Sequence, residues 1–200
     1  MNATESNGKL VIISGPSGAG KSTVVDLLLK NCALPLKLSV SATTRPPRKA
    51  EMDGEAYHFI DEHAFAQLRD DDAFLEYKDV FSSGYWYGTL RETVTTGLNQ
   101  GLWVILEIDI QGAFSVLDSI PDATTIFIHA GTIEELERRL TNRGSDTAES
   151  IARRLQVARD EMSFREQYMH QITNSDPMQA MSEICSILEK LENKIHARRT

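Results

Sequence analysis

The chain has 200 residues, of which 41% are hydrophobic and 25% are charged, and its formal net charge at pH 7 is −8. This composition is typical of one compact α/β domain, and the acidic balance argues against general nucleic-acid binding, which usually needs a basic surface. Any anionic ligand must therefore be held by local clusters of cations and backbone amides.

The chain also carries little sign of targeting or of metal-binding clusters. Its first eight residues, MNATESNG, are polar and lack the apolar core of a signal peptide, so we expect a disordered tail there. No apolar run approaches the roughly 18 residues that a membrane span needs, so a cytoplasmic protein without membrane contact is expected. Cys32 and Cys185 show no metal-ligand spacing and are expected to be free thiols, with a lone disulfide left open.

Strands and helices are predicted in alternation along the chain. The strands predicted from continuous apolar runs, typical of burial on both faces, are 10–13, 103–110 and 124–129. The helices predicted from apolar residues at helical spacing are 24–30, 133–140, 151–162 and 181–195. In the segment 35–97 short β-like stretches alternate with turns, and Asp61 is placed to cap a helix that runs to Gln67. The alternation favours a mainly parallel sheet covered by helices, with 35–97 and 141–154 inserted into it.

The segment 15–22, GPSGAGKS, matches the phosphate-loop pattern G-x-x-x-x-G-K-[ST] and lies between a predicted strand and a predicted helix. Its glycines let the backbone curl, so that N–H groups and the helix N-terminus face phosphate oxygens. Lys21 is then expected to reach the β- and γ-phosphates of ATP, and the Ser22 hydroxyl to ligate Mg²⁺. The alternative is a glycine-rich turn with an exposed lysine, which the flanking strand and helix disfavour.

A phosphate loop alone is compatible with motors, GTPases, helicases and small-molecule kinases. The length excludes most large motor ATPases, and the sequence has no NKxD-like guanine signature of GTPases. A small kinase must bind a second anion. Arg45 and Arg48, separated by Pro46 and Pro47, are placed to hold a phosphate together with Tyr57. The alternative for this segment is a solvated basic turn.

Several separated motifs together resemble the guanylate kinases, which transfer a phosphoryl group from ATP to GMP. The motifs are GPSGAGKST, SVSATTRPPR with GEAYHF, FLEY, YGT, ILEIDIQG and RLTNRGSDTAESIARRL, within residues 10–191. The resemblance implies a P-loop NTPase core of 9–34 and 98–200 with a lid at about 141–154, and a β-rich GMP-binding subdomain at 35–97, in one kinase domain. It implies ATP and GMP as partners, Mg²⁺ bound with ATP, no nucleic acid or membrane, and a monomer or homodimer.

The resemblance also assigns roles to individual residues. The implied ATP-binding residues are Gly15, Pro16, Ser17, Gly18, Ala19, Gly20, Lys21, Ser22, Thr23 and Asn174. The implied GMP-binding residues are Ser41, Arg45, Arg48, Tyr57, Glu76, Tyr87, Thr89 and Asp109. Among the latter, Ser41, Glu76 and Thr89 would read the guanine. The implied catalytic charges are Lys21, Arg45, Arg139, Arg143 and Arg154, the last three in a lid that closes over ATP.

The chemistry of these side chains agrees with the implied roles. Guanine presents N1–H and NH₂ donors side by side, which a carboxylate such as Glu76 accepts and which adenine lacks. Glu107 and Asp109 are predicted to lie two apart on one strand and to face the ligand-binding end of the sheet. The alternative for Glu76 is an exposed strand acid, and that for Glu107 and Asp109 is a buried structural pair. The alternative for the lid is a set of solvated helix arginines paired with Glu134, Glu135 or Asp160. Because a nucleotide phosphate is already anionic at pH 7, we expect direct in-line transfer without a general base.

Two segments depart from the family pattern. FSSGYWYGT is roughly two residues longer than the usual segment, as loops tolerate, so counting back from Gly88 selects Tyr87 as the phosphate ligand, with Tyr85 as a substitute. HAGTIEEL lacks the usual Pro-Pro-Ser before the lid helix, and Thr132 is expected to cap that helix instead.

Two rival functions remain open from the sequence. The first is another small kinase on the same scaffold, such as a ribose 1,5-bisphosphate kinase, which would not need the base-reading pair Glu76 and Ser41. The second is a non-catalytic guanylate-kinase-like module that binds phosphorylated partners, which has no use for Lys21, Ser22 or the lid arginines.

Overall fold

The computed structural model describes residues 8–48, 51–55, 57–79, 84–142 and 148–197. The chain divides into two compact units. The first unit comprises 1–11, 37–106 and 111–123, and the second unit comprises 12–36, 107–110 and 124–200.

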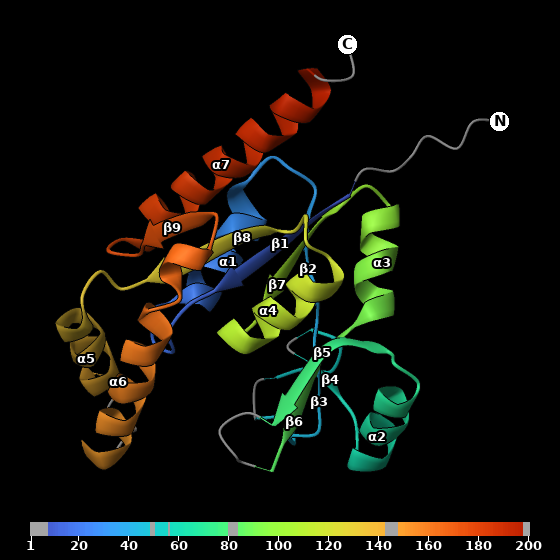
Figure 1. Ribbon diagram of the computed structural model, residues 1–200, viewed down its shortest axis with the longest axis horizontal. Helices are drawn as coiled ribbons and strands as arrows, with labels where there is room; N and C mark the ends of the chain where they lie inside the picture. The colour runs from blue at the N-terminus through green and yellow to red at the C-terminus, as the bar shows by residue number, and fades with distance from the viewer. Residues whose placement is uncertain (1–7, 49–50, 56, 80–83, 143–147, 198–200) are drawn as a thin grey trace. The chain divides into compact units, whose positions relative to one another are not determined.

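A five-stranded, mainly parallel sheet has the strand order β2-β7-β1-β8-β9 (Figure 1). Its strands are β1 (Lys9–Ser14), β2 (Leu36–Leu38), β7 (Trp103–Glu107), β8 (Thr124–His129) and β9 (His170–Thr173). β1, β7 and β8 are buried almost throughout, as their continuous apolar sequences require, and β8 pairs with β9 in parallel. The predicted mainly parallel sheet flanked by helices is therefore confirmed.

The helices of the second unit form two packed pairs. α1 (Lys21–Asn31) lies along α7 (Pro177–Ala197), and α5 (Ile133–Asn142) lies against α6 (Ala148–Met162) (Figure 1). A short 3₁₀ helix, Arg165–Gln167, follows α6. The side chains buried between α5 and α6 include Leu136, Leu140, Leu155 and Ala158. Thr132 caps α5 as predicted, since its hydroxyl oxygen accepts the amide of Glu135 at 3.2 Å.

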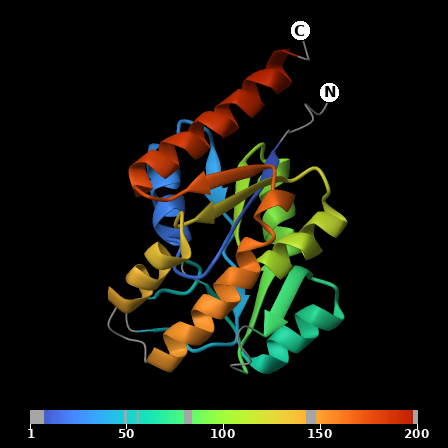
Figure 2. The same ribbon diagram turned by 60° about the vertical axis from the view of Figure 1, so that its left-hand side comes forward.

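The first unit contains a four-stranded sheet of order β4-β3-β6-β5. Its strands are β3 (Ala42–Thr43), β4 (His58–Phe59), β5 (Phe74–Asp79) and β6 (Trp86–Leu90). Helix α2 (Glu62–Asp70) lies beside this sheet (Figure 2), with Phe65 stacked on Phe74 at 4.5 Å between ring centroids. Asp61 caps α2 as predicted, because its carboxylate accepts the amide of Ala64 at 2.7 Å.

Some predicted elements differ from those observed. The strand predicted over 103–110 ends at Glu107, and α4 (Ile110–Ser119) begins only three residues later. The prediction that Glu107 and Asp109 share one strand is therefore wrong, because Asp109 lies in the connection between strand and helix. α3 (Arg91–Asn99), α4 and β9 were not predicted, since Val94 and Leu98 are the apolar side chains within α3, the start of α4 continues the apolar run of β7, and β9 has only four residues. None of the described helices is both long and apolar enough to cross a bilayer.

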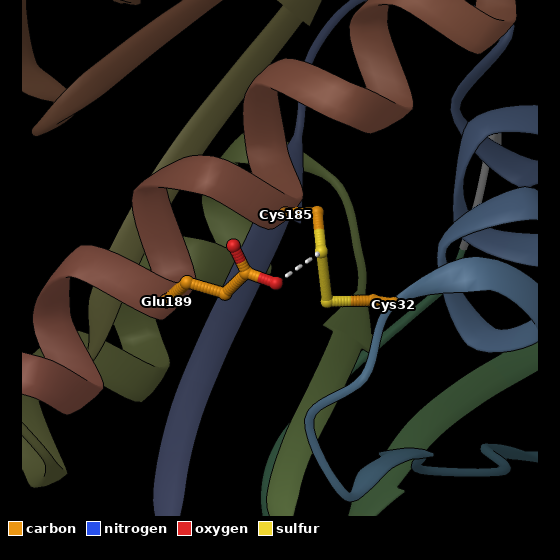
Figure 3. Close-up of side chains that lie close together, drawn as sticks. All are labelled: Cys32, Cys185 and Glu189. Carbon is orange, nitrogen blue, oxygen red and sulfur yellow. Dashed lines mark hydrogen bonds between the residues drawn. A yellow bond between two sulfur atoms is a disulfide. The ribbon is translucent and has the colours of Figure 1, made fainter.

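The two cysteines are bonded to each other. Cys32, at the C-terminal end of α1, forms a disulfide with Cys185 of α7, and their Cα atoms lie 5.7 Å apart (Figure 3). A carboxylate oxygen of Glu189, one turn further along α7, lies 3.5 Å from the sulfur of Cys185. The expectation of free thiols is wrong, because the 153-residue separation gives no sequence signal that α1 and α7 are neighbours.

Candidate functional site: a phosphate loop and an arginine-tyrosine cluster

The segment 15–20 joins β1 to α1 as a curled loop in the second unit. Gly15 and Gly20 have φ angles of 136° and 85°. A side chain at Gly15 would collide with the carbonyl oxygen of Ile128, and one at Gly20 with the side-chain amide of Asn174. Because only glycine combines these angles with so little space, the loop conformation is fixed by the sequence. The loop leads directly into the N-terminus of α1, a natural anion-binding position.

Lys21, the first residue of α1, folds its side chain back onto this loop. Its ammonium donates to the carbonyl oxygens of Gly15 (2.6 Å) and Pro16 (3.1 Å). Burial lowers the pKa of Lys21, and the opposing effect comes from the carboxylates of Glu107, Glu161 and Asp109. The lysine is thus held by neutral carbonyl groups, which an incoming phosphate can replace.

Ser22 and Glu107 form the part of this loop that suits a cation. The Ser22 hydroxyl donates to Oε1 of Glu107 at 2.6 Å, which joins α1 to the end of β7. A hydroxyl and a carboxylate are both hard oxygen donors, and Mg²⁺ prefers such ligands with phosphate oxygens and water completing its shell. These two side chains therefore have the chemistry to hold a Mg²⁺ ion.

Arg154 of α6 reaches the phosphate loop. Its guanidinium donates to the Ser17 hydroxyl oxygen at 2.9 Å, although the two residues are 137 positions apart. The predicted lid arginine and the predicted ATP-binding loop are therefore brought together. Arg143, the central arginine of the predicted lid, lies outside the described residues.

Asn174 forms hydrogen bonds with three segments around the phosphate loop. Its buried side-chain amide donates to the carbonyl oxygen of Ala19 at 2.8 Å, and its backbone amide donates to that of His129 at 2.8 Å. Its own carbonyl oxygen accepts Arg139 at 2.6 Å. The same guanidinium donates to Glu135 at 2.8 Å, so Arg139 is oriented from two sides.

In the first unit, Arg45 is surrounded by hydrogen-bond partners. Its Nε donates to the Tyr87 hydroxyl at 3.2 Å, and another nitrogen donates to the carbonyl oxygen of Pro46 at 2.8 Å. The third nitrogen donates to both carboxylate oxygens of Glu51, at 3.0 and 2.9 Å. Arg48 follows three residues later with an exposed side chain. The two arginines thus differ, one fixed by the protein and one presented to solvent.

Two tyrosines complete this cluster. The rings of Tyr57 and Tyr87 meet edge to face with centroids 5.6 Å apart, and the Arg45 guanidinium lies 5.5 Å from the Tyr57 ring centroid. Tyr85, the possible substitute for Tyr87, precedes β6 and is 38% exposed. The structure therefore places Tyr87, as aligned from the sequence, beside Arg45 and Tyr57.

The predicted guanine-reading residues lie on the same small sheet. Glu76 is paired with Thr89 across β5 and β6, and the Thr89 hydroxyl donates to the Glu76 carboxylate at 2.5 Å. Thr43 is opposite Tyr87 and Ala42 is opposite Gly88, and Ser41 immediately precedes β3. Because alternate residues share a face of a strand, Tyr87 and Thr89 point to the same side. The predicted phosphate ligand Tyr87 and the predicted base reader Thr89 therefore share one face of β6.

The remaining predicted site residues are placed as follows. Gly18 lies in the phosphate loop against the side chains of Leu136 and Leu140, and Thr23 is exposed in the first turn of α1. Asp109, predicted to help bind GMP, belongs to the second unit, whereas the other predicted GMP ligands belong to the first.

Two acids near these clusters, Glu51 and Glu161, were missed from the sequence, whereas Glu135 was considered as a partner of the lid arginines. Glu135 lies four residues before Arg139 on α5, a spacing that the sequence does reveal for a helix. Hydrogen bonds from Arg138 and then Arg139 lower the pKa of Glu135 to about 2. Glu51 and Glu161 have no comparable signal, because neither shares a regular element with the cation that it faces.

Comparisons with known proteins agree with this arrangement. Residues 7–191 match the family described as guanylate kinase. A guanylate kinase of Rhodopirellula baltica is 55% identical over 90% of this chain and 87% of its own length. One of Caldanaerobacter subterraneus subsp. tengcongensis is 41% identical over 90% and 86%, respectively. The crystal structure of guanylate kinase from Anaplasma phagocytophilum covers 94% of this chain and 88% of its own, with 32% identity and a TM-score of 0.74.

The family match spans nearly the whole chain, and it includes both the phosphate loop and the arginine-tyrosine cluster. The chain is accordingly a nucleoside-monophosphate kinase, a transferase, and it belongs to the guanylate kinase family.

Proposed function

We propose that this enzyme transfers the γ-phosphate of ATP to GMP, giving ADP and GDP, by direct in-line transfer. The observation that carries the choice of acceptor is the Glu76–Thr89 pair, on the same sheet as Tyr87, whose hydroxyl accepts a hydrogen bond from Arg45. A sugar phosphate would need no such pair beside its phosphate ligands. A binding module would need neither Lys21 nor its glycine-rich loop.

Guanine recognition follows from the chemistry of Glu76. Thr89 donates to one of its carboxylate oxygens, which fixes the orientation of the group. A carboxylate so held can accept the adjacent N1–H and NH₂ donors of guanine. Adenine offers an acceptor at N1, so it would leave that carboxylate oxygen unpaired and face it with a lone pair. Ser41, immediately before β3, would contribute a further hydroxyl to the base.

The phosphate of GMP would be held by Arg45, Arg48, Tyr57 and Tyr87. Because the Tyr87 oxygen already accepts the Nε–H of Arg45, its own proton can be donated to a phosphate oxygen. Arg48 would supply the second positive charge from its exposed side chain. Together these groups would orient the phosphate as a nucleophile without any general base.

ATP would bind with its phosphates in the 15–20 loop, and Lys21 would exchange its two carbonyl partners for phosphate oxygens. Ser22 and Glu107 would hold Mg²⁺, which neutralises charge on the transferring group when bound. Arg139, Arg143 and Arg154 would act as a lid that stabilises this charge and excludes water. Asp109 would belong to the acceptor pocket.

The same proposal assigns a function to each part of the chain. Residues 9–34 and 98–200 would form the ATP-binding core, with a lid at about 141–154, and 35–97 would bind GMP. Both substrates are metabolites of the cytoplasm, where we place the enzyme, as a monomer or a homodimer without nucleic-acid partners.

The test is turnover measured by coupled ADP release with GMP, AMP, UMP and ribose 1,5-bisphosphate as acceptors. GMP is expected to be the preferred acceptor by at least about 10²-fold in kcat/KM, because a buried polar mismatch is costly. A faster reaction with any other acceptor would overturn the proposal. Direct transfer is tested separately by single turnover with γ-labelled ATP, in which label trapped on the protein would contradict it.

A further inference from the structure

Glu51 is an acid inside the most basic segment of the chain, and neither the sequence motifs nor the proposed chemistry uses it. Its side chain is only 19% exposed, whereas Glu55 in the same loop is exposed. A carboxylate beside arginines that bind an anionic substrate repels that substrate, so its presence there calls for another role. Its contacts indicate what that is.

The Glu51 carboxylate is anchored by the turn that precedes it. The backbone amide of Arg48 donates to its Oε2 at 2.8 Å, and the Glu51 amide donates back to the Arg48 carbonyl at 3.0 Å. The Arg48 amide first, and then the Arg45 guanidinium, lower the pKa of Glu51. The carboxylate is therefore ionised at pH 7 and held by its own turn, rather than occupying the cluster as a loose substitute for phosphate.

From this anchor, Glu51 fixes one edge of the Arg45 guanidinium. Tyr87 fixes the Nε edge, and the rings of Tyr57 and Phe59 lie 5.5 and 5.7 Å from the guanidinium carbon. Arg45 is left 11% exposed. An arginine side chain otherwise loses considerable rotamer freedom when it binds a ligand, so a preset guanidinium binds phosphate with better geometry and a smaller entropic cost.

We propose that Glu51 is a positioning residue, whose carboxylate, held by the Arg48 amide, orients Arg45 toward the phosphate of GMP. The inference rests on the proposed function. It explains why a stretch with so many cations includes one shielded acid. The backbone hydrogen bond from Glu51 to Arg48 closes the turn, and the Glu51 carboxylate sets the direction of Arg45.

The test compares E51A and E51Q with the control E55A, in the wild-type and R45A backgrounds. In the wild-type background, E51A is expected to raise the KM for GMP about tenfold and to lower kcat several-fold, because a misdirected group loses alignment with the reacting atoms. The KM for ATP should stay within about twofold, since Glu51 touches no predicted ATP ligand, and E55A should match wild type. E51Q keeps an acceptor oxygen, so its KM for GMP should lie between those of the wild type and E51A.

A double-mutant cycle separates positioning from a general effect on the fold. If Glu51 acts through Arg45, E51A should change the KM for GMP by less than about threefold in the R45A background. Equal effects in both backgrounds, an equal rise in the KM for ATP, or a wild-type KM for GMP in E51A would overturn the inference. Thermal unfolding of each variant identifies any that fails to fold, in which case E51Q carries the comparison.

A second readout does not depend on turnover. The Nε–H signal of Arg45, assigned in ¹H–¹⁵N spectra by its loss in R45K, should be protected from solvent exchange in wild type and exposed in E51A. An unchanged signal would count against the inference even if kinetics moved. A wild-type chain that does not phosphorylate GMP would overturn the proposed function, whereas GMP turnover with an unaltered E51A would overturn this inference alone.

Discussion

The disulfide between Cys32 and Cys185 should dominate the stability of the second unit. It joins the end of α1 to α7 and closes a loop across a sequence separation of 153 residues. Chain-entropy arithmetic for a loop of that length gives about 5 kcal/mol, an upper value because compact unfolded chains have less entropy to lose. For a chain of this size, each kcal/mol shifts the Tm by roughly 2–4 °C, so reduction should lower it by about 10–20 °C.

The assay is thermal unfolding followed by circular dichroism, with and without dithiothreitol, on the wild type and on the variant C32S/C185S. The variant should unfold like the reduced wild type and should not respond to the reductant. Thiol titration should find reactive cysteines only after reduction. A Tm that reductant leaves unchanged would refute the loop-closure reasoning.

Activity gives a second, independent expectation for the same bond. Cys32 lies at the end of α1 opposite Lys21 and Ser22, so turnover at 25 °C should change by less than about twofold on reduction. Disulfides are rare in the cytoplasm, where thiols are kept reduced, so a cytoplasmic enzyme would work mainly in its less stable form. Loss of activity on reduction, without unfolding, would show that the bond acts on the phosphate loop.

Four further predictions address the site and its surroundings. K21A should lower kcat about 10³-fold and leave GMP affinity, measured by calorimetry, largely intact, because Lys21 contacts the donor loop. E76Q should lower kcat/KM for GMP by roughly 10²-fold, since the amide replaces one acceptor with a donor that faces guanine donors, and the AMP reaction should gain relative to it. N174A should lower the free energy of unfolding by about 1–3 kcal/mol and kcat several-fold. It removes the hydrogen bond from the side-chain amide to the phosphate loop and loosens the contact of Arg139. Burial raises the pKa of Tyr168 to about 12. The unfolded tyrosine ionises near pH 10, so stability present below pH 10 should fall as the pH rises toward 12, and Y168F, measured by urea unfolding, should not show this loss.

The phosphate loop could be predicted almost completely from the sequence, because its conformation depends on local residues. The positive φ angles at Gly15 and Gly20 and the buried strand before them follow from the motif itself. Arg45 and Tyr87 were also identified, through a resemblance that fixed their register. Their mutual hydrogen bond was not predictable, since it depends on how β3 pairs with β6.

What the sequence could not supply are contacts between segments far apart in the chain. The disulfide joins two helices whose periodicity says nothing about which other helix each one meets. Asn174 was predicted to bind ATP from its own position in the sequence. The hydrogen bond from its side-chain amide to Ala19, 155 residues away, was not predictable. Asp109 was placed on a strand because it lies within the run WVILEIDI, in which the acids Glu107 and Asp109 alternate with apolar residues. The apolar run does not show where backbone pairing stops.

The cationic side chains of an acidic enzyme must be held in place before any phosphate binds. The type of partner determines which of them change partners on binding and which keep them. Lys21 is bonded to uncharged carbonyl oxygens, which phosphate oxygens can replace with a gain in charge complementarity. Arg45 and Arg139 are bonded to the ionised acids Glu51 and Glu135, and breaking such pairs would leave partly shielded charges without compensation. The two arginines should therefore keep their acids when substrate binds and use their remaining N–H groups for it. The acidic residues then support phosphate binding by fixing the geometry of the cations, which reconciles a net charge of −8 with two anionic substrates.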